Sequence, residues 1–303
     1  MKNDLEITFY DLFDEWLNYK RTKVKESTYF NYSFVINESL KKYFQNVSLE
    51  EVKNLDFYSI IDELKQKVSR KTLRDRISIL KSVLRYGERK YDMDFKIDLI
   101  TMPTIYNKEI EVLTEREKNR ITKYLLDTKN IRELGILISL YTGLRIGEVC
   151  ALKWKNIDFE KKLIEVERTV QRIYRGEKNT KLLFTEPKTV KSIRKVPIAE
   201  ILLKKLKEIG KSYPKDAFIL TGTETRFMEP ITYRFTYKKC LRNCRISYKK
   251  FHCLRHTFAT RCIRAGMDVK SLSEVLGHNN VNVTLSIYVH SSYSVKKKFI
   301  DKI

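Results

Sequence analysis

The chain has 303 residues, and its 42% hydrophobic content argues against a disordered tail. Lysine and arginine total 61 against 38 acidic residues, so the formal net charge of +23 makes a polyanion the first candidate partner. No apolar run approaches the roughly 20 residues of a membrane span. The five cysteines are odd in number and form no Cys-x-x-Cys pair. We therefore expect a reduced, cytoplasmic protein with free thiols and no membrane segment.

Four segments in the first third of the chain repeat apolar residues at the spacing of one helix face. Thr8 and Asp11 are spaced as a capping box at the start of the first segment. The predicted helices cover residues 8–22, 26–44, 56–67 and 70–90.

The helix expected over 70–90 carries basic residues away from its apolar face. Its inward residues are predicted to be Leu73, Ile77, Leu80 and Leu84. The basic residues are Arg70, Lys71, Arg74, Arg76, Lys81 and Arg85. Taken alone, such a row favours a solvated helix face; beside a domain that acts on DNA, it favours phosphate contacts.

Helical periodicity is lost around Pro103 and returns at Thr114, where Glu117 completes a second capping box. We place a helical domain at 1–104, a linker at 105–112 and a second domain at 113–303. The second domain is expected to contain helices at about 115–127 and 130–142, a small antiparallel sheet within 162–198, and further helices after 199 that break near Pro214 and Pro230. The predicted fold class is therefore mostly α with a small antiparallel β-sheet.

Five short stretches of the second domain together offer two arginines, a lysine, two histidines and a phenol. No carboxylate pair or metal-type cluster lies beside them in the sequence. The stretches are Gly143–Glu148, Pro187–Thr189, His252–Arg255, Leu276–His278 and Tyr288. Fixed cations stabilise a phosphate whose negative charge grows in the transition state, and a tyrosine oxygen can form a covalent intermediate. The set predicts phosphodiester cleavage without a metal or other cofactor.

Each motif is weak by itself. Arg145 precedes a helical run and Glu148 lies one turn on, where it can hold the guanidinium; an ordinary surface ion pair has the same spacing. His252 and Arg255 share a helix face, and His256 is expected to point elsewhere. In isolation, His252 is more often a satisfied, partly buried histidine.

The two remaining motif residues are less distinctive. Lys188 lies in a predicted hairpin turn and is one of many lysines. Tyr288 is one of 18 tyrosines, and Tyr293 is the alternative nucleophile. The order and joint presence of the motifs carry the prediction.

In order, the motifs read G-L-R-x-G-E, P-K-T with a downstream R-K-V-P, H-x-L-R-H-T-F-A, L-G-H and Y-x-H. This order resembles the tyrosine recombinase (phage integrase) family over about residues 113–291. The N-terminal part is similar to the family's helical core-binding domain, most clearly at Ser69–Leu73. The resemblance implies a two-domain clamp around duplex DNA, with a core-binding domain and a catalytic domain.

The resemblance also implies a role for each motif residue. Arg145 and Arg255 would grip the scissile phosphate, and Lys188 would donate a proton to the leaving 5′ oxygen. His252 would assist proton transfer at the tyrosine, and His278 would hydrogen-bond a non-bridging oxygen. Tyr288 would attack and become a 3′-phosphotyrosine.

The family pattern further implies partners and a location. The expected partners are double-stranded recombination sites, a homo-tetramer assembled on DNA from monomers through a Holliday junction, and an excisionase or DNA-bending host protein. The protein would associate with the nucleoid in the cytoplasm. The segment after Tyr288 would pack on a neighbouring subunit through Val295, Phe299 and Ile300, the alternative being a frayed basic tail.

The most specific interpretation is the integrase of a mobile element. The stretch Glu167–Arg172 and the long loop expected to follow it, to Lys181, favour this reading over compact resolvases. An Xer-like dimer resolvase is the alternative, because the chain begins directly with the core-binding-like helices. A DNA-binding regulator without chemistry would not require the six motif residues together. A type IB topoisomerase would use related chemistry as a monomer and without two sites.

Overall fold

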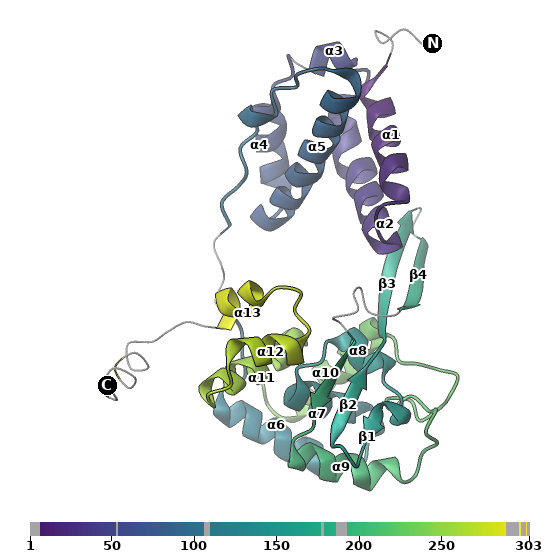
Figure 1. Ribbon diagram of the computed structural model, residues 1–303, viewed down its shortest axis with the longest axis vertical. Coiled ribbons are helices and arrows are strands. Elements are labelled where there is room, and N and C mark those ends of the chain that lie inside the picture. The colour runs from purple at the N-terminus through teal and green to yellow at the C-terminus, as the bar shows by residue number, and fades with distance from the viewer. Residues whose placement is uncertain are drawn as a thin grey trace. The chain divides into compact units, whose positions relative to one another are not determined.

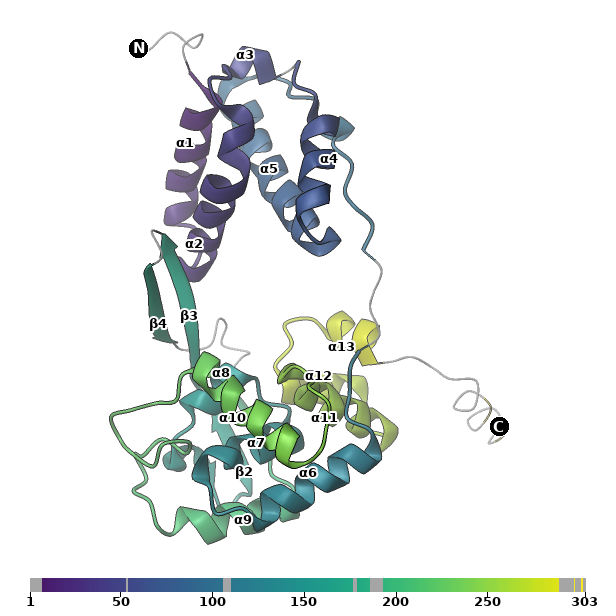
Figure 2. The same ribbon diagram turned by 180° about the vertical axis from the view of Figure 1, so that it is seen from behind.

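The computed structural model describes residues 7–52, 54–105, 110–176, 179–185 and 193–288, together with residues 297 and 301. The chain divides into two compact units, one of Met1–Lys108 with Ile173–Lys181 and one of Glu109–Arg172 with Leu182–Ile303. Helices dominate and the sheets are small and antiparallel, as predicted (Figures 1 and 2). Within the described ranges, no helix has both the length and the apolar character of a membrane span.

The first unit is built from helices around an aromatic core. Thr8 Oγ1 accepts the Asp11 N–H at 3.3 Å and the Asp11 carboxylate accepts the Thr8 N–H at 3.0 Å, which confirms the predicted capping box. Phe9 stacks on Phe44 with ring centroids 4.2 Å apart. The elements are α1 (Phe9–Arg21), α2 (Glu26–Val35), η2 (Ile36–Leu40), η3 (Lys41–Phe44), α3 (Leu49–Val52), α4 (Phe57–Lys67), α5 (Arg70–Tyr91) and η4 (Ile97–Leu99).

Helix α5 confirms its predicted apolar face and corrects two basic positions. Leu73, Ile77, Leu80 and Leu84 are all buried. Of the basic residues, Arg70, Lys71, Arg74 and Arg85 are exposed and Lys81 is half-buried. Arg76 is also half-buried, and its Nε is enclosed without a hydrogen-bond partner among the described residues. The prediction that all six basic residues lie away from the apolar face was therefore wrong for Arg76 and Lys81, which are one helical turn from buried Leu80 and Ile77 respectively.

The second unit is organised around α7, whose residues Ile136, Leu137 and Ile138 are fully buried. Helices α10 and α11 pack against it. Gly135 permits this approach, since an added Cβ would lie 2.6 Å from the Tyr233 hydroxyl. The helices are α6 (Glu115–Asp127), α7 (Ile131–Thr142), α8 (Ile146–Ala151), η5 (Trp154–Asn156), α9 (Glu200–Gly210), α10 (Pro230–Asn243), α11 (His252–Arg264), α12 (Val269–Leu276) and α13 (Val281–Tyr288).

Two small sheets complete the fold. The strands are β1 (Ile157–Asp158), β2 (Leu163–Val166), β3 (Thr169–Gly176), β4 (Asn179–Thr185) and β5 (Arg194–Pro197). The predicted antiparallel sheet within 162–198 is present, and in it β2 pairs with β5, with Ile164 opposite Val196. The long loop expected before Lys181 was wrong, because β3 and β4 form a second sheet there. Buried Val170 and Ile173 favour the strand despite the charges around them.

Thr257 fixes the start of the second unit to α11. Its hydroxyl accepts the Leu113 N–H at 2.9 Å and donates to the Cys253 carbonyl at 2.8 Å. Thr257 is 2% exposed, so water does not replace these bonds. The predicted capping box of Thr114 and Glu117 follows directly and starts α6.

We predict that Thr257→Val destabilises the second unit by about 1–3 kcal/mol, because the buried Leu113 N–H loses its acceptor. The measurement is urea unfolding followed by Trp154 fluorescence in a Trp16→Phe background, which removes the chain's other tryptophan. Thr257→Ser is the control and should remain within about 1 kcal/mol of the parent. Equal stability of the valine and threonine proteins would contradict the assigned bond.

Candidate active site

Arg255 joins the first turn of α11 to two other elements. Its Nη1 donates to the Gly143 carbonyl at 2.9 Å, and its Nη2 donates to the Leu276 carbonyl at 2.8 Å. The residue is only 1% exposed. A buried guanidinium requires partners for its charge and its donors, and carbonyls at the ends of α7 and α12 supply part of them. Arg255 therefore fixes three helices relative to one another.

Arg145 lies at the start of α8 and reaches the same helix end. Its Nη1 donates to Glu148 Oε1 at 2.9 Å, the predicted contact, and Glu148 Oε2 accepts the backbone N–H of Arg145 at 2.8 Å. Longer bonds of 3.4 and 3.3 Å run from its guanidinium to the carbonyls of Leu276 and Gly277. The Arg145 side chain is 39% exposed, in contrast to Arg255.

The carboxyl end of α12 is where the two arginines meet. Gly277 ends this helix in the left-handed conformation, with φ +65°. The Leu276 carbonyl accepts from both Arg145 and Arg255. The last carbonyls of a helix lack intrahelical partners and carry partial negative charge, so they attract guanidinium groups. Residues far apart in the sequence are thereby brought to one point.

The histidines complete this cluster. His278 follows Gly277, and its Nδ1 lies 2.8 Å from the hydroxyl of buried Thr284 on α13. The His252 ring meets the His256 ring edge-on, with centroids 4.5 Å apart. The expectation that His256 points elsewhere was wrong, because residues four apart on a helix are neighbours.

Both motif histidines are electrically neutral at neutral pH. Burial is the largest cause that lowers the pKa of His252, to about 4, and the charges of His256, Arg255 and Arg145 add to it. Burial likewise lowers the pKa of His278 to about 4, with Arg255 and Arg145 as the next causes. The positive charges of Arg145 and Arg255 therefore act on both imidazole rings. A neutral imidazole offers one N–H donor and one acceptor nitrogen.

We predict that the imidazoles of His252 and His278 titrate well below the free value of about 6.5. The unfolded chain takes up these protons near that value and the folded chain only near pH 4. The stability that the two groups contribute is thus present above pH 6.5 and is lost as the pH falls towards 4. NMR titration, assigned with His252→Asn and His278→Asn, measures the midpoints. A midpoint at or above 6.5 for either ring would be inconsistent with this environment.

Arg194 belongs to the same network, although the sequence analysis assigned it no role. Its Nη1 and Nη2 donate to Glu148 Oε1 and Oε2 at 3.0 and 2.9 Å. Burial raises the pKa of Glu148, but Arg194 and Arg145 outweigh that effect and hold the pKa at about 2. The signal was present in the strand pattern. Arg194 shares its face of β5 with buried Val196, and an arginine on a buried face requires an acidic partner.

Of the six predicted catalytic residues, the structure brings four together: Arg145, His252, Arg255 and His278. Lys188 lies outside the described residues, as do Tyr293 and the tail residues Val295, Phe299 and Ile300. Tyr288 is the last residue of α13, and its side chain is likewise outside the description. Helix α13 packs against α12 and α11, so the backbone of Tyr288 belongs to the same group of helices (Figure 1).

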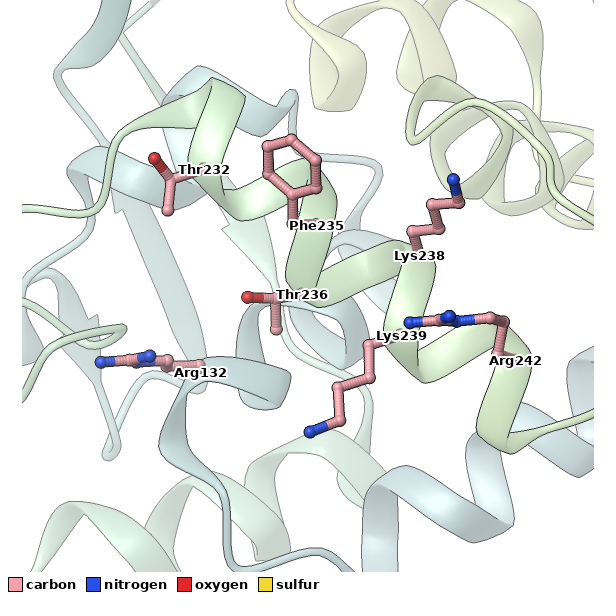
Figure 3. Close-up of a pocket in the computed structure, with 7 residues that line it drawn as sticks. All are labelled: Arg132, Thr232, Phe235, Thr236, Lys238, Lys239 and Arg242. Atoms are coloured by element: carbon pink, nitrogen blue, oxygen red, sulfur yellow. The ribbon is translucent and has the colours of Figure 1, made fainter.

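A separate basic pocket of about 470 Å³ lies on α10 (Figure 3). Its lining includes four cations, Arg132, Lys238, Lys239 and Arg242, and the 69% exposed Phe235. None of the four cations pairs with a carboxylate in the described part of the chain. The pocket contains none of the predicted catalytic residues.

Comparison with known families agrees with this geometry. The model of the phage integrase family matches residues 111–294, and that of the phage integrase N-terminal SAM-like domain matches residues 8–65. The chain belongs to the phage integrase family. The match to the phage integrase family spans every motif from Arg145 to Tyr288.

Individual relatives within the family are of more than one kind. A XerC-like tyrosine recombinase of Caldanaerobacter subterraneus subsp. tengcongensis is 31% identical, over 94% of this chain and 80% of the relative. The integrase of Staphylococcus phage L54a is 24% identical, over 98% and 92%. Among solved structures, the Tn1549 transposon integrase bound to a circular intermediate DNA has a TM-score of 0.75 at 23% identity, covering 98% of this chain and 99% of that one.

Proposed function

We propose that the chain is a site-specific DNA recombinase that cuts and rejoins DNA through a 3′-phosphotyrosine on Tyr288. The observation that carries this proposal is the meeting of Arg145 and Arg255 on one helix end, with His252 and His278 in the same electrostatic field. Membership of the phage integrase family supports it. Arginines placed around a phosphate stabilise the charge that develops as the phosphorus is attacked.

In this proposal the two arginines act differently. Arg145 is 39% exposed at its side chain and is the guanidinium that a phosphate reaches directly. Arg255 is 1% exposed and donates to two backbone carbonyls, so in this arrangement it acts on the phosphate through its charge. Direct contact between Arg255 and the phosphate would require the turn at Leu276 to move. This refines the expectation that both arginines grip the scissile phosphate alike.

The histidines and Lys188 handle protons in the proposed reaction. The Tyr288 oxygen bonds to phosphorus and the 5′ oxygen leaves, taking a proton from Lys188. Neutral His252 has a lone pair that can accept the tyrosine proton. If Thr284 donates to Nδ1 of His278, Nε2 carries the proton and can donate to a non-bridging oxygen. A 5′ hydroxyl then reverses the step, and one phosphoester replaces another without nucleotide hydrolysis.

We predict that Tyr288→Phe binds its DNA site with wild-type affinity and forms no covalent adduct, because the attacking oxygen is gone. The substrate is a nicked duplex that carries a site selected by the wild-type chain from a random pool; release of the fragment beyond the nick traps the adduct. Denaturing gels measure the covalent complex. An adduct formed by the variant would move the nucleophile elsewhere, with Tyr293→Phe as the matched test.

Positive charge from arginine and lysine removes the need for a metal in the proposed chemical step. We therefore predict that adduct formation by the wild-type chain in about 5 mM EDTA proceeds within twofold of its rate in Mg²⁺, since no metal-activated water takes part. Single-turnover cleavage of the same nicked duplex provides the rate. Abolition of cleavage by EDTA and its recovery with Mg²⁺ would refute this part of the mechanism.

The proposed partner is duplex DNA, held by a core-binding domain at 1–104 and a catalytic domain at 113–303, joined by the linker at 105–112. The exposed row on α5 would contact phosphates. It comprises Arg70, Lys71, Arg74 and Arg85, with half-buried Arg76 and Lys81 at its edge. Assembly as a tetramer through a Holliday junction, and help from an excisionase or a bending protein, belong to the same proposal.

We propose integration and excision of a mobile element as the biological role. The transposon and phage integrases among the relatives favour it. An Xer-like resolvase is the second candidate, favoured by the XerC-like relative. A plasmid with two selected sites in direct repeat distinguishes a recombinase of either kind from a topoisomerase and from a DNA-binding regulator. A recombinase deletes the DNA between the sites, a topoisomerase only relaxes the plasmid, and a regulator does neither. Flanking direct repeats beside the gene would then separate an integrase from a resolvase.

A further inference from the structure

Arg194 is buried, and burial of a cation is unfavourable because the charge loses its hydration. Its side chain is 5% exposed, at the first residue of β5. Its terminal nitrogens form a two-point bond with the Glu148 carboxylate, at 3.0 and 2.9 Å. Its Nε donates to the Val275 carbonyl at 2.7 Å. A buried ion pair is maintained only when geometry and further hydrogen bonds compensate for lost hydration, and this arginine has both.

The first partner of Arg194 also orients Arg145. Glu148 Oε1 accepts from Nη1 of Arg194 at 3.0 Å and from Nη1 of Arg145 at 2.9 Å. The carboxylate is therefore held between two guanidiniums. Arg194 contacts both carboxylate oxygens, so it fixes the plane of the group from which the more exposed arginine takes its orientation.

The second partner of Arg194 is the helix end that holds both catalytic arginines. The Val275 carbonyl accepts from Arg194, and the next carbonyl, of Leu276, accepts from Arg145 and Arg255. Arg194 also lies against the turn that leads to His278. A Cβ added to Gly277 would be 3.1 Å from Cδ of Arg194 and 3.2 Å from its Nε. The Arg194 side chain thus contacts both the Glu148 carboxylate, which orients Arg145, and the carboxyl end of α12, which binds Arg145 and Arg255.

We propose that Arg194 is a positioning residue of the reaction centre. It orients Glu148 on one side and the carboxyl end of α12 on the other, and so holds the guanidiniums of Arg145 and Arg255 in register without itself touching the DNA phosphate. This role rests on the recombinase activity proposed above. The alternative is that Arg194 only neutralises a buried carboxylate and supports the fold.

The test compares Arg194→Gln, Arg194→Lys and the wild-type chain in single-turnover cleavage at saturating protein. Displacement of a catalytic group by about 1 Å can slow a reaction on the order of 10²-fold. We expect Arg194→Gln to cleave about 10²-fold more slowly, while its affinity for the site stays within about threefold. Arg194→Lys keeps the charge but loses the planar fork, so it should remain closer to the glutamine variant than to wild type.

Lys205→Gln is the matched control. Lys205 is also a buried cation, 5% exposed and paired with Glu208 on α9, but it contacts none of the cluster. Its loss should lower stability and leave the cleavage rate per folded molecule within about twofold. Thermal unfolding gives the folded fraction of every variant. If Arg194→Gln does not fold, the comparison uses Arg194→Lys.

A double-variant cycle separates positioning from a general structural role. If Arg194 acts through Glu148, Arg194→Gln with Glu148→Gln should cleave within about threefold of the slower single variant. If the fold-losses in cleavage rate of the two single variants multiply in the double variant, Arg194 does not act through Glu148. Wild-type cleavage rates in both folded Arg194 variants, or full rescue by lysine, would overturn the positioning role as a whole.

A readout without DNA keeps this proposal distinct from the recombinase proposal. The Nε–H NMR signals of Arg145 and Arg255 should shift or broaden in Arg194→Gln and remain unchanged in Lys205→Gln. If the wild-type chain forms no adduct while these signals respond, the proposed function fails, and the signals still show that Arg194 holds the guanidiniums of Arg145 and Arg255 in place. If cleavage is intact in the wild-type chain and the signals do not respond, the positioning role fails alone.

Discussion

The carboxyl end of α12 is the constraint on which the rest of the site depends. Three consecutive carbonyls, of Val275, Leu276 and Gly277, accept from Arg194, Arg145 and Arg255. Three guanidiniums this close repel one another. They stay together because the helix end contributes partial negative charge and Glu148 contributes a full one. Positive charge remains in excess, and this is what a phosphate that gains charge in the transition state requires.

The positive charges of the same arginines also affect the protonation of His252 and His278. Burial and the neighbouring arginines disfavour the imidazolium form of His252 and His278, so both rings are neutral at neutral pH. A phosphate at Arg145 would offset part of that repulsion. In the proposed mechanism, the binding of DNA and the readiness of the histidines to take up a proton are therefore linked through Arg145 and Arg255.

Sequence patterns correctly predicted the features that depend on residues close together in the chain. Capping boxes at Thr8 and Thr114 set helix starts, and the apolar spacing of α5 identified its buried face. Patterns failed where a tertiary contact overrode them. Arg76 and Lys81 are half-buried beside the apolar face of α5, and a stretch rich in charges forms β3. Arg194 stands in the R-K-V-P motif, but its role was not predicted because that role comes from Glu148 and Val275, which neither adjoin it in sequence nor share its strand.

In the proposed reaction, Arg145 stabilises negative charge on the scissile phosphate. The most direct test of this role measures cleavage by the wild-type chain and by Arg145→Ala on two substrates, one with the normal phosphate and one with an uncharged methylphosphonate at the scissile position. The account predicts a loss of at least ~10³-fold on the phosphate, shrinking to less than about tenfold on the methylphosphonate. An equal loss on both substrates would show that Arg145 does not act on that charge, and would contradict the account.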